Sequence, residues 1–465
     1  MLGASPRTQR SHSSIQLPPE FSQGITQVPL FAYKTSDFVY DLRESTSNDE
    51  REEEEEGDQF LEREKEIPKN KKLKDLIHQR WEAGKERGAI NYQLNCMYKF
   101  LDGNYELCIQ LNAERGELRR KPMRFKSIRE PFSPLRFNFT KLNEAEVMLY
   151  LKCEDRPITN DPLDRHLVAV NASPLTKYHS LIIPTVNKCL PQVLTATGVR
   201  VAVDMMLLVV DETFHVLFNS LLGHASVNHL HLHTLYWPYD SDLVNRRFEP
   251  LGDIKDAYVI RPPDWFCSAF AFQLLNKDGY EKFMSNLTKC VEFLTERDQA
   301  HNVFFTRAQA VRLDGALRVE DRRNERGRYV TAYVFPRSNM HGAKPPTSFS
   351  PAACELAGCL TAYTYRFFES VTEQAAVRVI EEEALLPEER FSNLSTDLGC
   401  LLAGRPVINR PAAFSQLEGL TSPEIDELHD SFQTFEPHSP ARTPRNGRPR
   451  TSSADALFMS RLKID

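Results

Sequence analysis

Three histidines alternate with two leucines in residues 228–237, which read NHLHLHTLYW. In a β-strand alternate residues face the same side, so His229, His231 and His233 would share one surface while the leucines enter a core. On a helix this spacing would turn the rings apart, because only residues three or four positions apart meet. The aromatic and β-branched residues that follow favour a strand. The segment is therefore predicted to be a strand with a histidine-lined face.

Around this strand, residues 68–405 are predicted to form one catalytic domain of mixed α and β structure. Strands come in groups with few helices between them, which favours an α+β fold with a mostly antiparallel sheet and packed helices. A helix followed by two strands occurs twice, so two related halves and ordinary α+β alternation both stay open. Strands are expected at 148–153, 166–172, 179–184, 214–220, 228–237, 257–262, 302–308 and 328–336, and helices from 71 to about 84–88 and at 190–210, 278–299, 372–385 and 388–403.

The two ends of the chain have a different composition. Residues 1–67 are polar and contain the acidic run 52–56, and dense like charges repel and cannot bury a core. This N-terminal segment is predicted to be disordered, with an acidic interaction tail as the sharper alternative. Residues 406–465 lose periodicity, and 436–453 are rich in Pro, Arg and Ser. They are predicted to be a flexible tail.

Composition excludes several classes of function. The 465 residues carry a net charge of −6, so no strong basic field is available to hold a nucleic-acid backbone. The nine cysteines are dispersed and form no C-x-x-C pair, which fits reduced thiols better than a disulfide framework. The N-terminus lacks the apolar stretch of a signal peptide, and no apolar run is long enough to span a bilayer. A cytoplasmic protein without nucleic-acid or membrane partners is expected.

Three interpretations of the histidine face compete. It could be a polar sheet surface without chemistry, although three adjacent buried imidazoles would each need hydrogen-bond partners. It could bind zinc or iron, but no Asp or Glu lies within the segment. It could also carry a nucleophile that attacks phosphorus, because a neutral imidazole offers an unprotonated nitrogen at pH 7. This third interpretation is favoured, and it requires no metal or cofactor.

At this point the residues resemble a known family. His229-Leu-His231-Leu-His233-Thr-Leu is similar to the His-φ-His-φ-His-φ-φ motif of the histidine-triad superfamily, in which φ is apolar. A histidine-triad-like fold is therefore expected. Residues resembling the remainder of the superfamily pattern occur in order along the chain: Asn171, His179, Asn219, Gly223 and Ser226.

Segments 125–141, 218–220 and 225–233 closely resemble the GDP-D-glucose phosphorylase family, whose plant relatives are the GDP-L-galactose phosphorylases. Segment 355–358 is also similar, and the resemblance spans about 90 to 365. It implies a nucleotidyltransferase that moves the guanylyl group of GDP-D-glucose to inorganic phosphate, giving GDP and hexose 1-phosphate. A homodimer is a further possibility.

The resemblance also implies residue roles. His231 would attack the α-phosphorus while its other ring nitrogen donates to a backbone carbonyl. His233 and Ser226 would contact α-phosphate oxygens, and His229 would order the site from the first position. Asn219 would bind ribose or phosphate. His179 and Asn171 are further substrate-binding candidates. On charge and position alone, candidates for binding the substrate phosphates are Lys141, Arg129 and Arg136. The alternative for each of these three is a surface ion pair.

The chain departs from the superfamily pattern at three positions. Tyr178 and Leu222 stand where glycines are expected, and Ala225 stands where Gln is common in the superfamily. The two lost glycines bear on turn geometry and on how closely backbone approaches a phosphate. A histidine-triad nucleotide hydrolase that uses water as acceptor is the enzymatic alternative. A metal- or nucleotide-binding scaffold without turnover is the non-enzymatic one.

Overall fold

A computed structural model describes residues 28–43, 69–119, 123–156, 165–237, 239, 241–314, 329–340 and 349–407. The chain divides into two compact units at Val407, and the second unit lies wholly outside the described residues, as does almost all of the predicted C-terminal tail. No helix within the described part of the chain is both long enough and apolar enough to cross a membrane.

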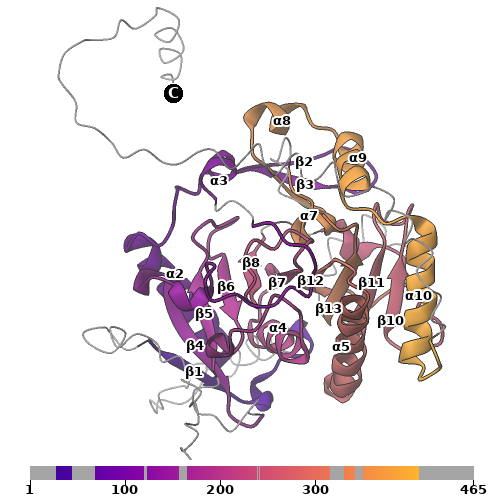
Figure 1. Ribbon diagram of the computed structural model, residues 1–465, viewed down its shortest axis with the longest axis horizontal. Coiled ribbons are helices and arrows are strands. Elements are labelled where there is room, and N and C mark those ends of the chain that lie inside the picture. The colour runs from indigo at the N-terminus through magenta and orange to yellow at the C-terminus, as the bar shows by residue number, and fades with distance from the viewer. Residues whose placement is uncertain are drawn as a thin grey trace, which may run out of the picture. The chain divides into compact units, whose positions relative to one another are not determined.

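One large mixed sheet organises the described residues (Figure 1). All of its neighbouring strands pair antiparallel except the first pair, so the predicted α+β class with a mostly antiparallel sheet is confirmed. In spatial order its strands are β1 (Leu30–Tyr33), β4 (Val147–Cys153), β5 (His166–Val170), β6 (Ser180–Ile183), β8 (Leu232–Tyr236), β7 (Phe214–Asn219), β12 (His301–Ala308), β13 (Tyr329–Pro336), β11 (Ala269–Leu274), β10 (Ala257–Ile260) and β9 (Glu249–Pro250).

Different layers cover the two faces of this sheet. One face packs on helices, among which α4 and α5 lie side by side (Figure 1). The other face packs on a smaller sheet and short helices. The helical layer contains α2 (Lys69–Glu86), α4 (Ala196–Leu208), α5 (Tyr280–Glu296) and α10 (Glu388–Leu402). The layer on the other face contains the small sheet, in the order β14 (Cys359–Ala362), β3 (Cys108–Leu111) and β2 (Met97–Phe100), and the short helices α7 (Ala353–Leu356), α8 (Tyr365–Ser370) and α9 (Glu373–Glu383). Helix α3 (Ala113–Leu118) follows β3.

The sheet contains the same topology twice. In the first half β5, β6, α4, β7 and β8 follow one another, and the strands lie in the order β5-β6-β8-β7. In the second half β10, β11, α5, β12 and β13 do the same, in the order β10-β11-β13-β12. The halves meet where β7 pairs antiparallel with β12, with Asn219 opposite Asn302. The repeated order therefore favours two related halves over generic alternation.

The helix expected at 190–210 begins later, at Ala196. Pro191 and the residues after it run into an N-cap at Thr195, whose side-chain oxygen accepts a hydrogen bond from the Gly198 N–H at 3.4 Å. A capping hydroxyl at this position satisfies an amide that has no partner within the helix, and it fixes where the helix begins.

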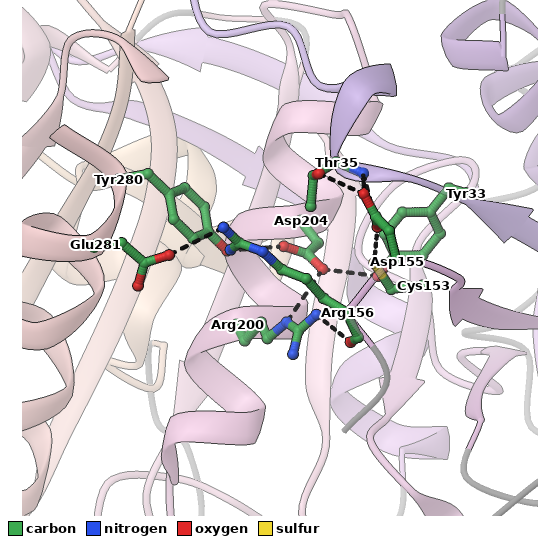
Figure 2. A network of polar contacts seen from close by, with 9 residues as sticks. All are labelled: Tyr33, Thr35, Cys153, Asp155, Arg156, Arg200, Asp204, Tyr280 and Glu281. Atoms are coloured by element: carbon green, nitrogen blue, oxygen red, sulfur yellow. Dashed lines mark hydrogen bonds and ion pairs between the residues drawn. The ribbon is translucent and has the colours of Figure 1, made fainter. Parts of the chain in front are cut away.

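The expectation of a disordered N-terminus needs correction for the described residues 28–43. Strand β1 pairs with β4 at the edge of the large sheet, with Leu30 in register with Tyr150. The Tyr33 hydroxyl donates to the buried Asp204 carboxylate of α4 at 2.8 Å (Figure 2). Charge and polarity flagged the acidic run but not the short apolar stretch before it, which gains its order by long-range pairing. The remainder of 1–67 lies outside the described residues.

Candidate active site

A cavity of about 200 Å³ lies on the face of the large sheet that also packs on the small sheet. Its walls come from the strands of the first half, from the loop around Phe139, and from α3 and α7. Among the predicted site residues, those that line it are Asn171, His179, Asn219, Ser226, His231 and His233. Folding thus brings six of the ten predicted residues to one cavity, although these six are spread over more than 60 positions of the sequence.

The strand that carries the histidines is shorter than expected. It begins at Leu232, so His229, which lies in a bend, and His231 both precede β8. Leu230 and Leu232 nevertheless enter the helix-covered core, as the alternation predicted. The Leu230 N–H donates to the Leu190 carbonyl at 2.8 Å, not to a neighbouring strand. The inward direction of the leucines therefore continues beyond the strand end, where the backbone bonds to the segment before α4 and not to a strand.

His231 is held on both its backbone and its ring. The Gln192 side chain accepts from the His231 N–H at 2.9 Å and donates to the His231 carbonyl at 3.1 Å. Nδ1 lies 2.7 Å from the His229 carbonyl oxygen, so Nδ1 carries the proton and donates. In a neutral imidazole this leaves Nε2 with the free lone pair. Burial lowers the pKa of His231 to about 4, which keeps the ring neutral at pH 7.

His229 does not line the cavity. Its ring is fully buried between Phe132 and Phe139, with ring centroids 5.2 and 5.7 Å away. Its Nδ1 accepts the Phe139 N–H at 3.1 Å, and its carbonyl accepts from His231. The first histidine therefore connects the loop around Phe139 to the ring of the second.

A chain of hydrogen bonds sets the tautomer of His233. The Leu175 N–H donates to His179 Nδ1 at 2.8 Å, so the proton of neutral His179 lies on Nε2. That Nε2 is 3.1 Å from His233 Nδ1, which therefore accepts, and the His233 proton lies on its own Nε2. Burial lowers the pKa of both rings well below the ordinary value. His233 thus offers a neutral N–H donor beside the lone pair of His231, with ring centroids 5.2 Å apart.

Two asparagines fix the surroundings of these rings. Asn171 accepts from the Ser173 N–H at 2.9 Å, and its amide nitrogen lies 3.5 Å from the acceptor His233 Nδ1. The same nitrogen is 3.0 Å from His179 Nε2, a contact between two N–H donors that is not a hydrogen bond. Asn219 Oδ1 accepts from Asn302 Nδ2 at 2.6 Å and from the Ala353 N–H at 3.0 Å. Asn219 therefore ties the first half of the sheet to β12 and α7, and its own amide group can donate to a bound ligand.

The two positions where glycine is expected adopt backbone angles that favour glycine. Tyr178 has a φ of +65° and Leu222 a φ of +37°. This conformation costs an L-residue roughly 1–2 kcal/mol. Packing offsets the cost, because the Tyr178 ring stacks on His78 at 3.7 Å between centroids and Leu222 is buried in a small apolar cluster. At Gly223 itself, a Cβ atom would lie 2.6 Å from Ser220 Oγ, so the close approach excludes a side chain.

Three predicted phosphate ligands do not line the cavity, and their contacts agree better with the alternative of a surface role. Lys141 Nζ donates to the Pro134 and Arg136 carbonyls at 2.8 and 3.0 Å. Arg136 forms an ion pair with Glu130 at 3.1 Å, and Arg129 is exposed. None of the three lines the cavity. Charge and sequence position could not distinguish local loop contacts from contacts with a ligand.

Sequence reasoning missed other charged and polar residues of the cavity wall. Arg115 and Arg119 of the α3 region line the cavity and have no motif. Gln192, which holds the His231 backbone but does not line the cavity, has no motif either. Glu355 was quoted as part of a similar segment but received no role, although it lines the cavity. The four-residue spacing of the two arginines, which puts them on one helix face, was the only local signal.

The Nδ1 atom of each histidine described above is engaged with a backbone or side-chain group. No group of three or more His, Cys, Asp or Glu side chains that could hold a metal ion occurs among the residues for which coordinates are described. The arrangement can instead present one nucleophilic nitrogen and a neighbouring N–H donor to a tetrahedral centre.

Comparison with known proteins gives two family-model matches. The model "GDPGP1-like, N-terminal domain" matches residues 72–235, and "GDPGP1-like, C-terminal domain" matches residues 256–402. The chain is 60% identical over 442 residues to GDP-D-glucose phosphorylase 1 of Caenorhabditis elegans, covering 95% of this chain and 90% of the relative. It is 34% identical over 312 residues to the human GDP-D-glucose phosphorylase 1, covering 66% and 78%. GDP-L-galactose phosphorylase 1 of Arabidopsis thaliana is 24% identical over 344 residues, covering 70% and 72%.

Proposed function

The chain belongs to the GDPGP1-like family, and from this premise we propose that it is a GDP-D-glucose phosphorylase that works through a covalent adduct on His231. It is an enzyme of the nucleotidyltransferase type, and its substrates are a GDP-hexose and inorganic phosphate. The observation that supports His231 most is the 2.7 Å contact from Nδ1 to the His229 carbonyl, since it leaves the lone pair on Nε2 of a neutral ring.

In the first step, His231 Nε2 attacks the α-phosphorus of the GDP-hexose. A P–N bond forms, the bond from the α-phosphorus to the bridging oxygen breaks, and hexose 1-phosphate leaves with that oxygen. Negative charge on the α-phosphate oxygens is stabilised by N–H and O–H donors placed around the phosphorus. His233 Nε2–H and the Ser226 hydroxyl supply such donors in this proposal, and Asn219 contacts ribose or phosphate.

In the second step, an oxygen of inorganic phosphate attacks the same phosphorus and the P–N bond breaks. GDP leaves, and His231 returns to its neutral form with the electron pair of the broken bond. Two displacements at one nitrogen divide a single difficult substitution into two easier ones. If water replaces phosphate as the acceptor, the product is GMP and the enzyme is a histidine-triad nucleotide hydrolase.

Labelled substrate tests the adduct directly. Full-length protein is mixed with GDP-glucose labelled at the α-phosphorus, without inorganic phosphate. We expect label on the protein that is stable to base and labile to acid, as a phosphorus–nitrogen bond requires, and its release as GDP when phosphate is added. The proposal is wrong if no label is retained, or if turnover of GDP-glucose is indifferent to phosphate.

We also propose a cytosolic location, because all nine cysteines are free thiols, the form that a reducing compartment maintains. The cysteine state of protein isolated from cells under alkylating conditions tests this point.

Light scattering of the full-length protein tests the expected homodimer.

A further inference from the structure

Two arginines line the same cavity as the histidines, and the charge of one of them, Arg115, acts on His179 and His233. Among the described residues that line it, Arg115 and Arg119 are the two whose side chains carry a full positive charge. The reaction proposed above places a second phosphate next to the α-phosphate in both steps. A dianion entering a half-enclosed cavity is desolvated unless fixed cations or donors replace its water. The positions of these two guanidinium groups therefore decide where that phosphate can bind.

Both arginines are held in place, and one keeps an unused donor. Arg119 donates to the Tyr363 hydroxyl at 2.9 Å, and its guanidinium lies 4.8 Å from the centre of the Tyr363 ring. Arg115 donates to the Ser173 carbonyl through Nη1. Its Nε is buried and has no hydrogen-bond partner within the described part of the chain. A buried donor without a partner is uncommon in folded proteins, and a ligand oxygen would satisfy it.

Two further residues make this end of the cavity suitable for an anion. His224 lines the cavity, and its Nε2 is buried without a partner among the described residues. Glu355 lies in the same wall, and its Oε2 accepts the Ala352 N–H at 3.1 Å. Burial raises the pKa of Glu355 to about 7, against the opposing effect of Arg115 and Arg119, so near neutral pH this carboxyl is partly protonated and can donate. An acidic group at this place therefore need not repel a phosphate.

In-line displacement connects this wall to both steps. The leaving oxygen in the first step and the attacking oxygen in the second lie on the same side of the α-phosphorus, opposite His231 Nε2. The leaving phosphate and the incoming phosphate must then occupy one position in turn. We propose that Arg115 and Arg119 form this shared subsite, which holds the β-phosphate of the GDP-hexose first and inorganic phosphate second. The inference rests on the proposed function and adds the residues that select phosphate over water as acceptor.

The test measures acceptor choice in the full-length protein. Arg115→Gln and Arg119→Gln are each compared with wild type for the KM of inorganic phosphate and for the ratio of GDP to GMP formed from GDP-glucose. Losing a charge-assisted hydrogen bond should raise the KM for phosphate at least about tenfold. The share of GMP should rise at the same time, because water then competes better for the adduct.

Matched controls separate the subsite from general effects of charge. Arg129→Gln and Arg136→Gln remove arginines that lie outside the cavity, and they should leave both measurements unchanged. Arg115→Lys and Arg119→Lys keep the charge but lose the planar fork of donors, so an intermediate KM is expected. If a Gln variant does not fold, the Lys variant at that position carries the comparison. A readout without turnover is the thermal shift that inorganic phosphate causes relative to chloride at equal ionic strength, which should vanish in the double Gln variant.

Two negative outcomes have different meanings. If folded Arg115 and Arg119 variants keep the wild-type KM for phosphate and the wild-type product ratio, the subsite is assigned to the wrong residues while the phosphorylase proposal stands. If the wild-type protein itself shows no dependence on phosphate, the proposed function fails before the subsite is tested.

Discussion

At the scale of single residues, the chemistry depends on which nitrogen of each ring carries the proton. The spacing of the three histidines does not contain that information. A backbone carbonyl sets it for His231, and the Leu175 N–H sets it for His233 through His179. Because burial also keeps these rings neutral, one ring supplies a lone pair and its neighbour an N–H. Identical side chains thus acquire opposite roles from the groups that contact them.

Replacing His231, the proposed nucleophile, should abolish the proposed adduct without unfolding the protein. We expect His231→Ala to lower kcat by at least about 10³-fold, as loss of a covalent nucleophile typically does. The measurement is GDP formation from GDP-glucose and phosphate, together with thermal unfolding. His215→Ala removes a comparably buried histidine of β7 that does not line the cavity, and it should retain activity in its folded fraction. Equal losses in the two variants would show that the His231 effect is structural.

At the scale of elements, the N-terminal strand is bound to both halves of the molecule. Figure 2 shows Asp204 of α4 between the hydroxyls of Tyr33 and Tyr280, which lie 2.8 and 3.2 Å from its two oxygens. Tyr33 belongs to β1 and Tyr280 opens α5. The Arg156 side chain, 3.0 Å from Glu281, closes the same cluster above the Tyr280 ring. One buried carboxylate therefore links an edge strand to the central helices of the two halves.

Removing one hydroxyl from this cluster should reduce stability. Tyr33→Phe takes a donor from a buried carboxylate, and we expect the free energy of unfolding to fall by about 1–3 kcal/mol. Burial raises the pKa of Asp204 to about 6, so the loss should be smaller below pH 6, where the protonated carboxyl no longer needs the donor as strongly. Urea unfolding at pH 7.5 and 5.5 measures the loss of stability and its dependence on pH. Tyr150→Phe on the neighbouring strand β4 is the matched control, and an equal effect there would contradict the role of the cluster.

At the scale of the whole molecule, the two topologically equivalent halves contribute different side chains to the cavity. The first half carries the histidines, while β13, which corresponds to β8, reads Tyr-Val-Thr-Ala-Tyr-Val-Phe-Pro and has none. The second half still reaches the cavity, because Asn302 of β12 and Ala353 of α7 hold the Asn219 side chain. A single continuous sheet allows the second half to support the chemistry without performing it.

The buried histidines should make the fold sensitive to mild acid. Their folded-state pKa values lie below the unfolded value of 6.5, so unfolding takes up protons, and the stability present above pH 6.5 is lost as pH falls towards 4. Asp204 and Glu355 act in the opposite direction, but they are two groups against eight. The histidines whose pKa is lowered by burial are His78, His179, His215, His224, His229, His231, His233 and His301.

Urea unfolding measures this sensitivity. We expect the free energy of unfolding to be at least about 2 kcal/mol lower at pH 5.5 than at pH 7.5. In a His215→Asn variant the free energy of unfolding should depend less steeply on pH, because about one fewer proton is taken up on unfolding. Equal or greater stability at pH 5.5 would contradict the assignment of neutral buried rings.

The sequence by itself determined the features that repeat or alternate locally. The two-residue period at residues 229–233 placed Leu230 and Leu232 in the core, and apolar periodicity located α5 and α10 within two or three residues. Such patterns are set by the geometry of one strand or helix, so no distant partner is needed to recognise them. The resemblance of short segments to a family was equally local, and it named the nucleophile as a prediction that the adduct experiment tests.

Only the tertiary structure decided which charges surround His231, the proposed nucleophile. Lys141, Arg129 and Arg136 are close in sequence to a family-like segment yet contact their own loop or solvent, whereas Arg115 and Arg119 reach the cavity from a helix without a motif. Strand β1 likewise orders only because β4 lies beside it, more than 110 residues later. Contacts of this kind depend on where the chain returns in space, and residue type and spacing along the sequence do not specify that.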